Sequence, residues 1–466
     1  MEPAANLSAL DVGVVVVYLL AILPVGLFLG GRAKTESDFA IAGRRLSARS
    51  VGLSAFISWV GLAGLFGTVE NVYKFGLSGI WWFQAWLPGV LLMAYLLATR
   101  LRGRLHVTVP EIISAHSGPR ARVVASLVTS WNYLAWVAVQ VFALGTIFRM
   151  CTPVGPTTGT IIAFLIVVAY TLSGGLSAVV VTDIFQATIV IGVILIAAPL
   201  AALVRGGGLS EVVAQTREIP DFYTLFKGAG GRTLTVWFIS LLPAAFIDPG
   251  GLQKAFAASD PATARRGLLL SAALYFLLGL SVTFLGVVAR AALPAVDPQQ
   301  AMPAVLLHVL PSGFAGLAIV AFLGAAMSTA DTALVVVATT LQRDVYAPLR
   351  PDASGKERLL VTRALVLLFG LTALLIALTA EGVVAILLMG FALYVPGLFL
   401  PMLAASFGWR LPRRAMLLTI LAGAGSAALW TILKEPKVPA IVIGLAVSLV
   451  PFSVGLLLDR DRRDRR

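Results

Sequence analysis

A cluster of polar residues interrupts one of the most apolar stretches of the chain, residues 313–337. Ser328, Thr329, Asp331 and Thr332 lie near its middle, in the sequence AAMSTADTALVV. At about 100° per helical residue, these four residues and Ala325 fall within roughly 160° of arc, on one side of a helix. A carboxylate at the centre of a bilayer costs about 2.5–3.5 kcal/mol on insertion scales, so the cluster is expected to have a partner or a function.

The ligands that this cluster offers are all oxygen atoms. Hydroxyl, carboxylate and carbonyl oxygens suit a hard cation such as Na⁺, and the small Ala325 lets another helix approach its carbonyl. The hydroxyls alone are also explained by hydrogen bonds to their own helix or to a neighbour. The presence of Asp331 favours cation binding.

Two further acids lie in apolar surroundings. Asp183 forms a polar patch with Thr182 and Gln186 in SGGLSAVVVTDIFQ, which suits a cation or a proton, or else caps the start of its helix. Asp248 lies in the sequence DPGG, where it either contacts a substrate or stabilises a turn.

A few larger side chains in apolar runs are candidates for a substrate cavity. They are Trp59, Gln84, Gln140 and Tyr394, which we group with Asp248 as candidate substrate-binding residues. Contacts between helices, or aromatic residues at the membrane interface, explain them equally well.

The elements that must position these residues are membrane helices. Hydrophobic residues make up 59% of the 466 residues and charged residues 12%, with the charges in short clusters between apolar runs. The fold class is therefore all-α polytopic membrane protein, in one membrane domain over residues 1–466. We predict thirteen spans, at residues 10–30, 48–70, 79–99, 121–151, 157–173, 177–204, 233–256, 267–293, 313–341, 359–379, 383–407, 415–433 and 439–458.

The basic residues indicate topology. The net charge of +13 comes from Lys and Arg that border the spans and form no surface stripe, so we expect no nucleic-acid partner. The positive-inside rule places the N terminus outside and the C terminus in the cytoplasm. Because residues 1–11 contain no Lys or Arg, the first span is expected to be retained and not cleaved as a signal peptide.

Two spans are interrupted at corresponding places. The second span has glycines at positions 61, 64 and 67, and the seventh has Pro243 and then DPGG at 248–251. The two spans are five apart. Because a five-span unit crosses the membrane an odd number of times, a second copy of it must insert upside down relative to the first. We therefore predict inverted repeats at residues 48–204 and 233–407, with one extra N-terminal and two extra C-terminal helices. The alternative is that glycine and proline are simply common in membrane helices.

The chain lacks the residue patterns that other classes of function require. The chain has one cysteine, Cys151, three histidines without metal-ligand spacing and no GxxxxGK[ST] motif. No nucleophile or catalytic acid pair is evident, so we predict no enzyme and no catalytic residues. Transport by this chain would draw its energy from an ion gradient.

Several ordered segments carry a family resemblance. They are SDFAIAGRRL, TVPEIISAHSG, SGGLSAVVVTDIFQ, DPGGLQKAFAASDPATARRG and MSTADTALVVVATTLQRDVY. Over roughly residues 10–410 the chain resembles the sodium:solute symporter family. The resemblance implies the inverted-repeat fold of the leucine transporter with an extra N-terminal helix.

The resemblance also implies site residues. A Na⁺ site would use the carbonyl oxygens of Ile57, Val60 and Ala325 and the hydroxyls of Ser328 and Thr329. A second site, for Na⁺ or a proton, would involve Asp183, Ser328, Asp331 and Thr332. Trp59 replaces an acid of the proline-transporting branch, which weakens an assignment to proline.

Our leading hypothesis is a symporter of a bacterial-type inner membrane that imports a small polar organic solute with Na⁺ as coupling ion. Its partners would be the solute, Na⁺ and the lipid bilayer, with no obligatory protein partner. One alternative is a proton-coupled or uncoupled carrier of the same fold. Another is a transporter-like solute sensor, although the C-terminal tail, LLLDRDRRDRR, is too short for an output domain.

Overall fold

The computed structural model describes residues 7–30, 40–103, 106–151, 155–205, 208–311, 313–380, 382–409, 411–433 and 438–464. Within these ranges the chain is helical apart from turns and one isolated backbone bridge between Leu46 and Ala258. Ten helical segments there are long and apolar enough to cross a membrane. The predicted all-α polytopic class is confirmed, whereas the count of thirteen spans stays a prediction.

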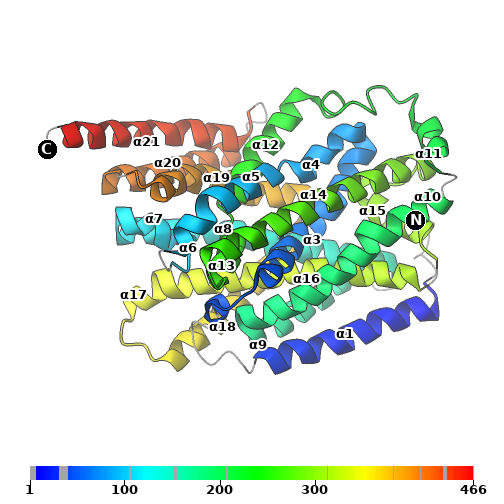
Figure 1. Cartoon of the computed structure of the whole chain (residues 1–466), viewed down its shortest axis with the longest axis horizontal. Coiled ribbons are helices and arrows are strands. Elements are labelled where there is room, and N and C mark those ends of the chain that lie inside the picture. Colours follow the sequence, from blue (N-terminus) through cyan, green and yellow to red (C-terminus); the bar gives the residue numbers. More distant parts are fainter. Residues whose placement is uncertain are drawn as a thin grey trace.

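The long helices lie roughly along a common direction (Figure 1). They are α1 (Ala9–Gly30), α3 (Ala48–Phe75), α8 (Pro119–Cys151), α9 (Pro156–Val190), α12 (Gly230–Phe246), α14 (Pro261–Ala292), α16 (Phe314–Leu341), α18 (Gly355–Thr379), α19 (Val383–Phe407), α20 (Arg413–Ile432) and α21 (Ala440–Asp464). Between them lie α4 (Trp81–Gln84), α5 (Leu87–Leu92), α6 (Thr99–Arg102), α7 (Val109–Ser117), α10 (Ala198–Arg205), α11 (Gly208–Thr216), α13 (Pro249–Ala257), α15 (Ala301–Val309) and α17 (Ala347–Leu349). Short 3₁₀ turns are η1 (Ala42–Arg44), η2 (Gly76–Ile80) and η5 (Pro298–Gln300), and π-helical turns are η3 (Met93–Ala98), η4 (Ile191–Ala197) and η6 (Gln342–Tyr346).

Local sequence signals set where several helices begin. Ser47 caps α3 by accepting a hydrogen bond from the Ser50 N–H, and Asp260 caps α14 at the Thr263 N–H with Pro261 in the first turn. Each cap satisfies a backbone N–H that has no partner within the helix. The helix starts are thus encoded locally, independently of membrane burial.

Burial separates a core from a periphery. The apolar window of the segment that contains α16 is 100% buried, whereas the windows of α18, α20 and α21 are 22–33% buried. Helices α3, α8 and α9 pack directly against α16. The polar cluster of the sequence therefore lies on the most enclosed helix and not on one that faces lipid.

Three helical segments are interrupted in the core. Helix α3 breaks at Gly61, α9 breaks at Gly175 (φ 59°, ψ −175°), and Ile247 and Asp248 separate α12 from α13. The predicted breaks in the second and seventh spans are confirmed. The Gly175 break falls between the predicted spans 157–173 and 177–204.

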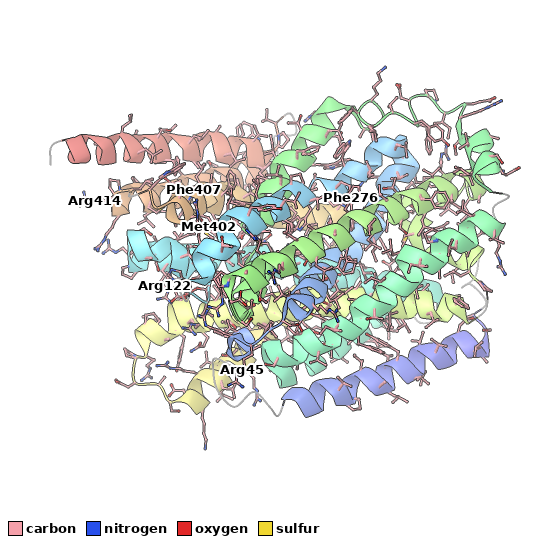
Figure 2. The ribbon with its side chains drawn as sticks, in the orientation of Figure 1. Arg45, Arg122, Phe276, Met402, Phe407 and Arg414 are labelled. Carbon is pink, nitrogen blue, oxygen red and sulfur yellow. The ribbon has the colours of Figure 1, made fainter. Side chains whose placement is uncertain are left out.

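The two ends of the molecule differ. Helix α1 begins at one end and α21 finishes at the other (Figure 1). Arg45, Arg122 and Arg414 lie toward the end where α21 finishes (Figure 2). Which side of a membrane this end faces stays a prediction.

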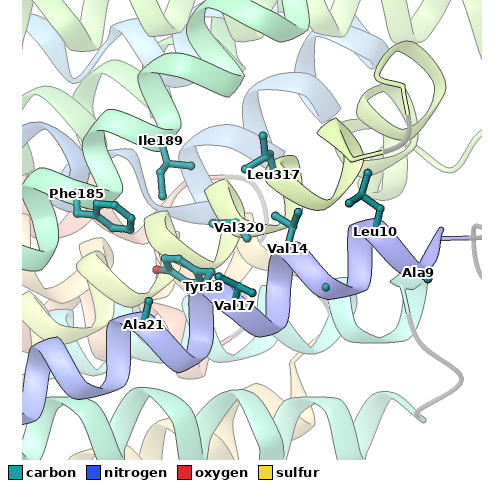
Figure 3. A pocket seen from close by; sticks show the side chains of 11 residues that line it. Ala9, Leu10, Val14, Val17, Tyr18, Ala21, Phe185, Ile189, Leu317 and Val320 are labelled. Atoms are coloured by element: carbon teal, nitrogen blue, oxygen red, sulfur yellow. The ribbon is translucent and has the colours of Figure 1, made fainter.

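A groove of about 490 Å³ runs between α1, α9 and α16 (Figure 3). Its lining is apolar, with Val14, Val17, Phe185 and Leu317 among the side chains. Because it offers almost no polar groups, it suits lipid tails and not a polar solute.

Candidate functional site

The break in α3 frees polar backbone groups inside the core. Gly61 has φ 33° and ψ 165°, so the regular hydrogen-bond pattern of the helix stops there. The Leu62 N–H donates to Oε1 of Gln140 on α8, at 2.9 Å. In a regular helix the Leu62 N–H would bond to the Ser58 carbonyl, so the last turn before the break, residues 57–60, contains carbonyl oxygen that can accept from, or bind, another group.

The polar face of α16 lies against this break. Thr329 is 2% exposed, and its Oγ1 donates to the Ala325 carbonyl at 2.9 Å. A Cβ at Gly61 would lie 3.1 Å from Thr329 Oγ1. Ser58 Oγ lies 3.2 Å from Ser328 Oγ and 3.0 Å from Thr332 Oγ1. Ser328 and Thr329 of the predicted Na⁺ site thus lie beside Ser58 and Gly61, the α3 residues next to the predicted ligands Ile57 and Val60.

Asp248 holds the start of α13. Its Oδ2 accepts from Trp59 Nε1 at 2.8 Å and from the Gly251 N–H at 2.6 Å, and its Oδ1 accepts from the Tyr133 hydroxyl at 2.6 Å. The same hydroxyl accepts from the Gly250 N–H at 2.6 Å. The carboxylate therefore has three donors within the protein and joins α3, α8 and α13.

Tyr394 fixes the other side of this break. It is fully buried on α19, and its hydroxyl donates to the Ile247 carbonyl at 2.7 Å. A carbonyl left free at the end of α12 is thereby satisfied. Tyr394 and Asp248 together hold the two ends of the interruption.

Two small cavities lie between the broken helices. One, with room for about 20 Å³, is lined by Trp59, Gly61, Ala63, Gly64, Trp82, Trp86, Trp136, Gln140, Leu241, Tyr275, Leu387 and Phe391. The other, about 10 Å³, is lined by Ser58, Trp59, Tyr133, Trp136, Asp248, Gly250, Thr329 and Thr332. A cavity of this size holds at most about one water, so the region is closed around its aromatic walls.

The predicted substrate residues divide into two groups. Trp59, Gln140 and Asp248 line these cavities, and Tyr394 is bonded to the neighbouring Ile247. Gln84 points elsewhere, because its Nε2 donates to the Phe276 carbonyl on α14 at 3.0 Å. Phe276 is labelled in Figure 2. Gln84 therefore joins two helices away from the cavities.

The residues of the predicted second cation site are also divided. Asp183 on α9 accepts short hydrogen bonds from the hydroxyls of Ser54 and Ser328. Asp331 accepts from the Thr171 hydroxyl at 2.5 Å, and its second oxygen has no hydrogen-bond partner among the described residues. Asp183 and Thr332 share one polar network, and Asp331 bonds to another part of α9.

The sequence interpretation missed a lysine in that network. Lys254, on α13, is fully buried, and its Nζ lies 3.4 Å from Asp183 Oδ2 and 3.1 Å from Thr332 Oγ1. The signal was available, because a lysine within a predicted span requires a partner. Tyr133 donates to Asp248, and nothing in the sequence of its apolar helix indicates this role.

Backbone and side-chain contacts fix the C-terminal end of α13. Arg102 Nε donates to the Ala258 carbonyl at 2.8 Å, and its Nη2 donates to the Ser259 carbonyl at 3.1 Å. Leu46 pairs with the same turn, donating to the Ala257 carbonyl at 3.0 Å and accepting from Ser259 N at 3.1 Å. The end of α13 is thus fixed to α6 and to the segment before α3.

Known proteins are similar to this chain in sequence and in fold. The high-affinity proline transporter PutP of Bacillus subtilis is 27% identical, with 88% of this chain and 89% of that protein covered. The human sodium/iodide cotransporter is 25% identical, with 84% and 66% covered. A solved Na⁺-coupled sialic acid symporter, in a substrate-bound outward-open state, has a TM-score of 0.84 at 19% identity, covering 97% of this chain and 98% of that one. The leucine-transporter-type fold is therefore confirmed.

The relatives and structural neighbours are transporters and not enzymes. A model of the sodium:solute symporter family matches residues 39–423, most of the chain. The protein is a multi-pass membrane transporter, and it belongs to the sodium:solute symporter family.

Proposed function

We propose that the protein is a secondary active symporter that imports a small polar organic solute together with Na⁺ by alternating access. The observation that carries this proposal is the break of α3 at Gly61, packed against the hydroxyl-bearing face of α16. Na⁺ is cargo here, since it crosses the membrane with the solute.

The Na⁺ site would consist of the carbonyl oxygens of Ile57, Val60 and Ala325 and the hydroxyls of Ser328 and Thr329. Freed carbonyls next to a helix break are the donor type that coupling ions use in broken-helix transporters. The Thr329 hydroxyl donates to the Ala325 carbonyl at 2.9 Å, a bond within α16 that Na⁺ would replace by taking both oxygens as ligands.

The solute would lie between the breaks, in contact with Trp59, Trp136 and Gln140. Three donors already hydrogen-bond to the Asp248 carboxylate. We therefore expect Asp248 to hold the walls of the solute site in place more than to bind a cationic group of the solute. Aromatic walls with few free polar groups favour a compact solute with an apolar body over a sugar that needs many hydrogen bonds.

Na⁺ and solute binding would be coupled because both depend on the same arrangement of α3 and α16. Na⁺ held by both α3 and α16 favours the conformation in which these helices form the outward-open solute site. Each ligand then raises the affinity of the other, by the same factor in both directions.

The remaining topology belongs to the same proposal. Residues 48–204 and 233–407 would be the two inverted repeats, in a bacterial-type inner membrane with the N terminus outside and the C terminus in the cytoplasm. The basic residues at one end support this orientation.

Substitution of the α16 hydroxyls tests the ion site. In proteoliposomes, Ser328→Ala and Thr329→Ala should raise the Na⁺ concentration for half-maximal solute uptake about tenfold or more, since each loses an ion ligand. Thr339→Ala is the matched control, because the Thr339 hydroxyl lies on α16 and has no hydrogen-bond partner among the described residues. Unchanged Na⁺ activation in both test variants would remove the site.

A thermal-shift panel tests the solute class. Proline, iodide and sialic acid, the solutes of the relatives named above, would each be added in Na⁺ and in K⁺. Stabilisation that requires Na⁺ identifies the solute, because a ligand that binds only the folded state raises its stability. Equal stabilisation in K⁺ contradicts sodium coupling.

A proton-coupled carrier is the second candidate, and one observation favours it. Asp331 is fully buried, and one of its carboxylate oxygens has no hydrogen-bond partner among the described residues. Solute uptake driven by a pH gradient in Na⁺-free buffer would support this candidate over the first.

A further inference from the structure

Lys254 carries a positive charge into the most enclosed part of the molecule. Its side chain and that of Asp183 are both 0% exposed, with Nζ 3.4 Å from Asp183 Oδ2. A buried ammonium away from water requires a compensating charge and hydrogen bonds. The pair provides the charge, and the surrounding groups provide the bonds.

The ammonium is surrounded by oxygen atoms from several helices. Nζ donates to the Ser54 carbonyl at 3.0 Å, to the Ser58 hydroxyl in a short bond, and to Thr332 Oγ1 at 3.1 Å. With the Asp183 carboxylate, these ligands come from α3, α9 and α16. One carboxylate, two hydroxyls and a carbonyl make up the kind of oxygen set that binds a hard cation.

This oxygen set includes Asp183 and Thr332, two residues of the second cation site that the family resemblance implies. An ion placed there beside the ammonium would bring two positive charges close together in a low-dielectric interior, where repulsion is strong. The set therefore accommodates either the ammonium or a free cation.

We propose that the Lys254 ammonium is a tethered cation that occupies the position of a second coupling ion, so that each chain binds one Na⁺ and not two. The inference rests on the proposed function, because it concerns how many ions that function uses. Lys254 lies on α13, whose first residues border the solute cavity, so this cation stays with the protein when α13 moves.

Equilibrium binding of radioactive Na⁺ to the purified full chain in nanodiscs tests the proposal. We expect one Na⁺ per wild-type chain. Lys254→Ala removes the ammonium and leaves the carboxylate, hydroxyls and carbonyl, so this variant should bind two. Its melting temperature should also rise about twice as steeply with the logarithm of Na⁺ concentration, because each bound ion adds its own mass-action term.

Two further variants distinguish a change in Na⁺ binding from a general loss of structure. The double variant Lys254→Ala with Asp183→Asn removes both charges, so it should return to one Na⁺ per chain. Lys74→Ala removes a lysine outside the site, whose Nζ lies 2.6 Å from Glu70 Oε1. This variant should leave the Na⁺ count at one.

The count for the wild-type chain needs no substitution, so it can overturn the proposal even if a variant fails to fold. Two Na⁺ per wild-type chain, or a count in Lys254→Ala equal to wild type, overturns the tethered cation. If the wild-type chain binds no Na⁺ and Lys254→Ala binds one, the tethered cation stands and the Na⁺ site of the proposed function fails.

Discussion

Asp331 shares its helix with the proposed Na⁺ ligands and has different partners. One carboxylate oxygen accepts from Thr171, and the other has no hydrogen-bond partner among the described residues. Asp331→Asn keeps an acceptor for Thr171 and removes a buried acid, so we expect unchanged Na⁺ activation and an equal or higher melting temperature. Uptake assays at several Na⁺ concentrations, with thermal unfolding, check this. A large loss of Na⁺ dependence would assign Asp331 to the ion site.

Tyr133 connects two groups with one hydroxyl, since it donates to Asp248 and accepts from the Gly250 N–H. Tyr133→Phe leaves both buried groups short of a partner, at a cost of about 1–3 kcal/mol. We expect a lower melting temperature and weaker solute binding, with the Na⁺ count unchanged. Tyr95→Phe, at an exposed position, is the control and should alter none of these.

At the scale of the element, the break in α3 depends on one glycine. Gly61 has φ 33°, and a Cβ there would lie 3.1 Å from Gln140 Nε2 and Thr329 Oγ1. Gly61→Ala should cost about 1–3 kcal/mol in backbone strain and crowd the Na⁺ site. Gly425→Ala, in α20 with open space around it, is the matched control. Retention of wild-type stability and Na⁺ activation by Gly61→Ala would mean that the break is dispensable.

The elements themselves could largely be predicted from the sequence. The predicted spans 313–341 and 383–407 match α16 (Phe314–Leu341) and α19 (Val383–Phe407) closely, because long apolar runs bounded by breakers leave few alternatives. Glycine and DPGG also indicated where the core helices break.

Side-chain partners could not be predicted in the same way. Asp331 bonds to Thr171, 160 positions away in the chain, and Gln84 turns toward Phe276, 192 positions away. Such pairings depend on how helices rotate against each other, and a hydrophobic pattern does not specify this rotation to within one side chain. For the same reason, the sequence shows Lys254 and Asp183 each as a charge in an apolar span, but it does not show that the two side chains pair.

At the scale of the whole molecule, Arg102 ties the C-terminal end of α13 to α6. Its hydrogen bonds to the Ala258 and Ser259 carbonyls join α6 to the C-terminal end of α13, whose first residues border the solute cavity. Hydrogen bonds from a charged group contribute about 1.5–3 kcal/mol, so Arg102→Ala should shift the population by about tenfold or more toward a state in which the end of α13 has left α6.

Thiol labelling measures this shift. A cysteine at the buried position 257, in a chain with Cys151 replaced, should react faster with maleimide when Arg102→Ala is present. Arg49→Ala removes an exposed arginine near the same end and should leave the rate unchanged. A labelling rate that Arg102→Ala leaves unaltered would mean that this contact does not hold the end of α13 in place.

The aromatic walls of the cavity also determine how the protein can be observed. Four of the nine tryptophans, Trp59, Trp82, Trp86 and Trp136, line a single cavity. Indole emission depends on local polarity, so an entering solute that displaces water or changes the packing of these rings should alter the intrinsic fluorescence. The chain thus carries an optical reporter at the position where its solute is expected, and ligands can be screened without a dye or an introduced label.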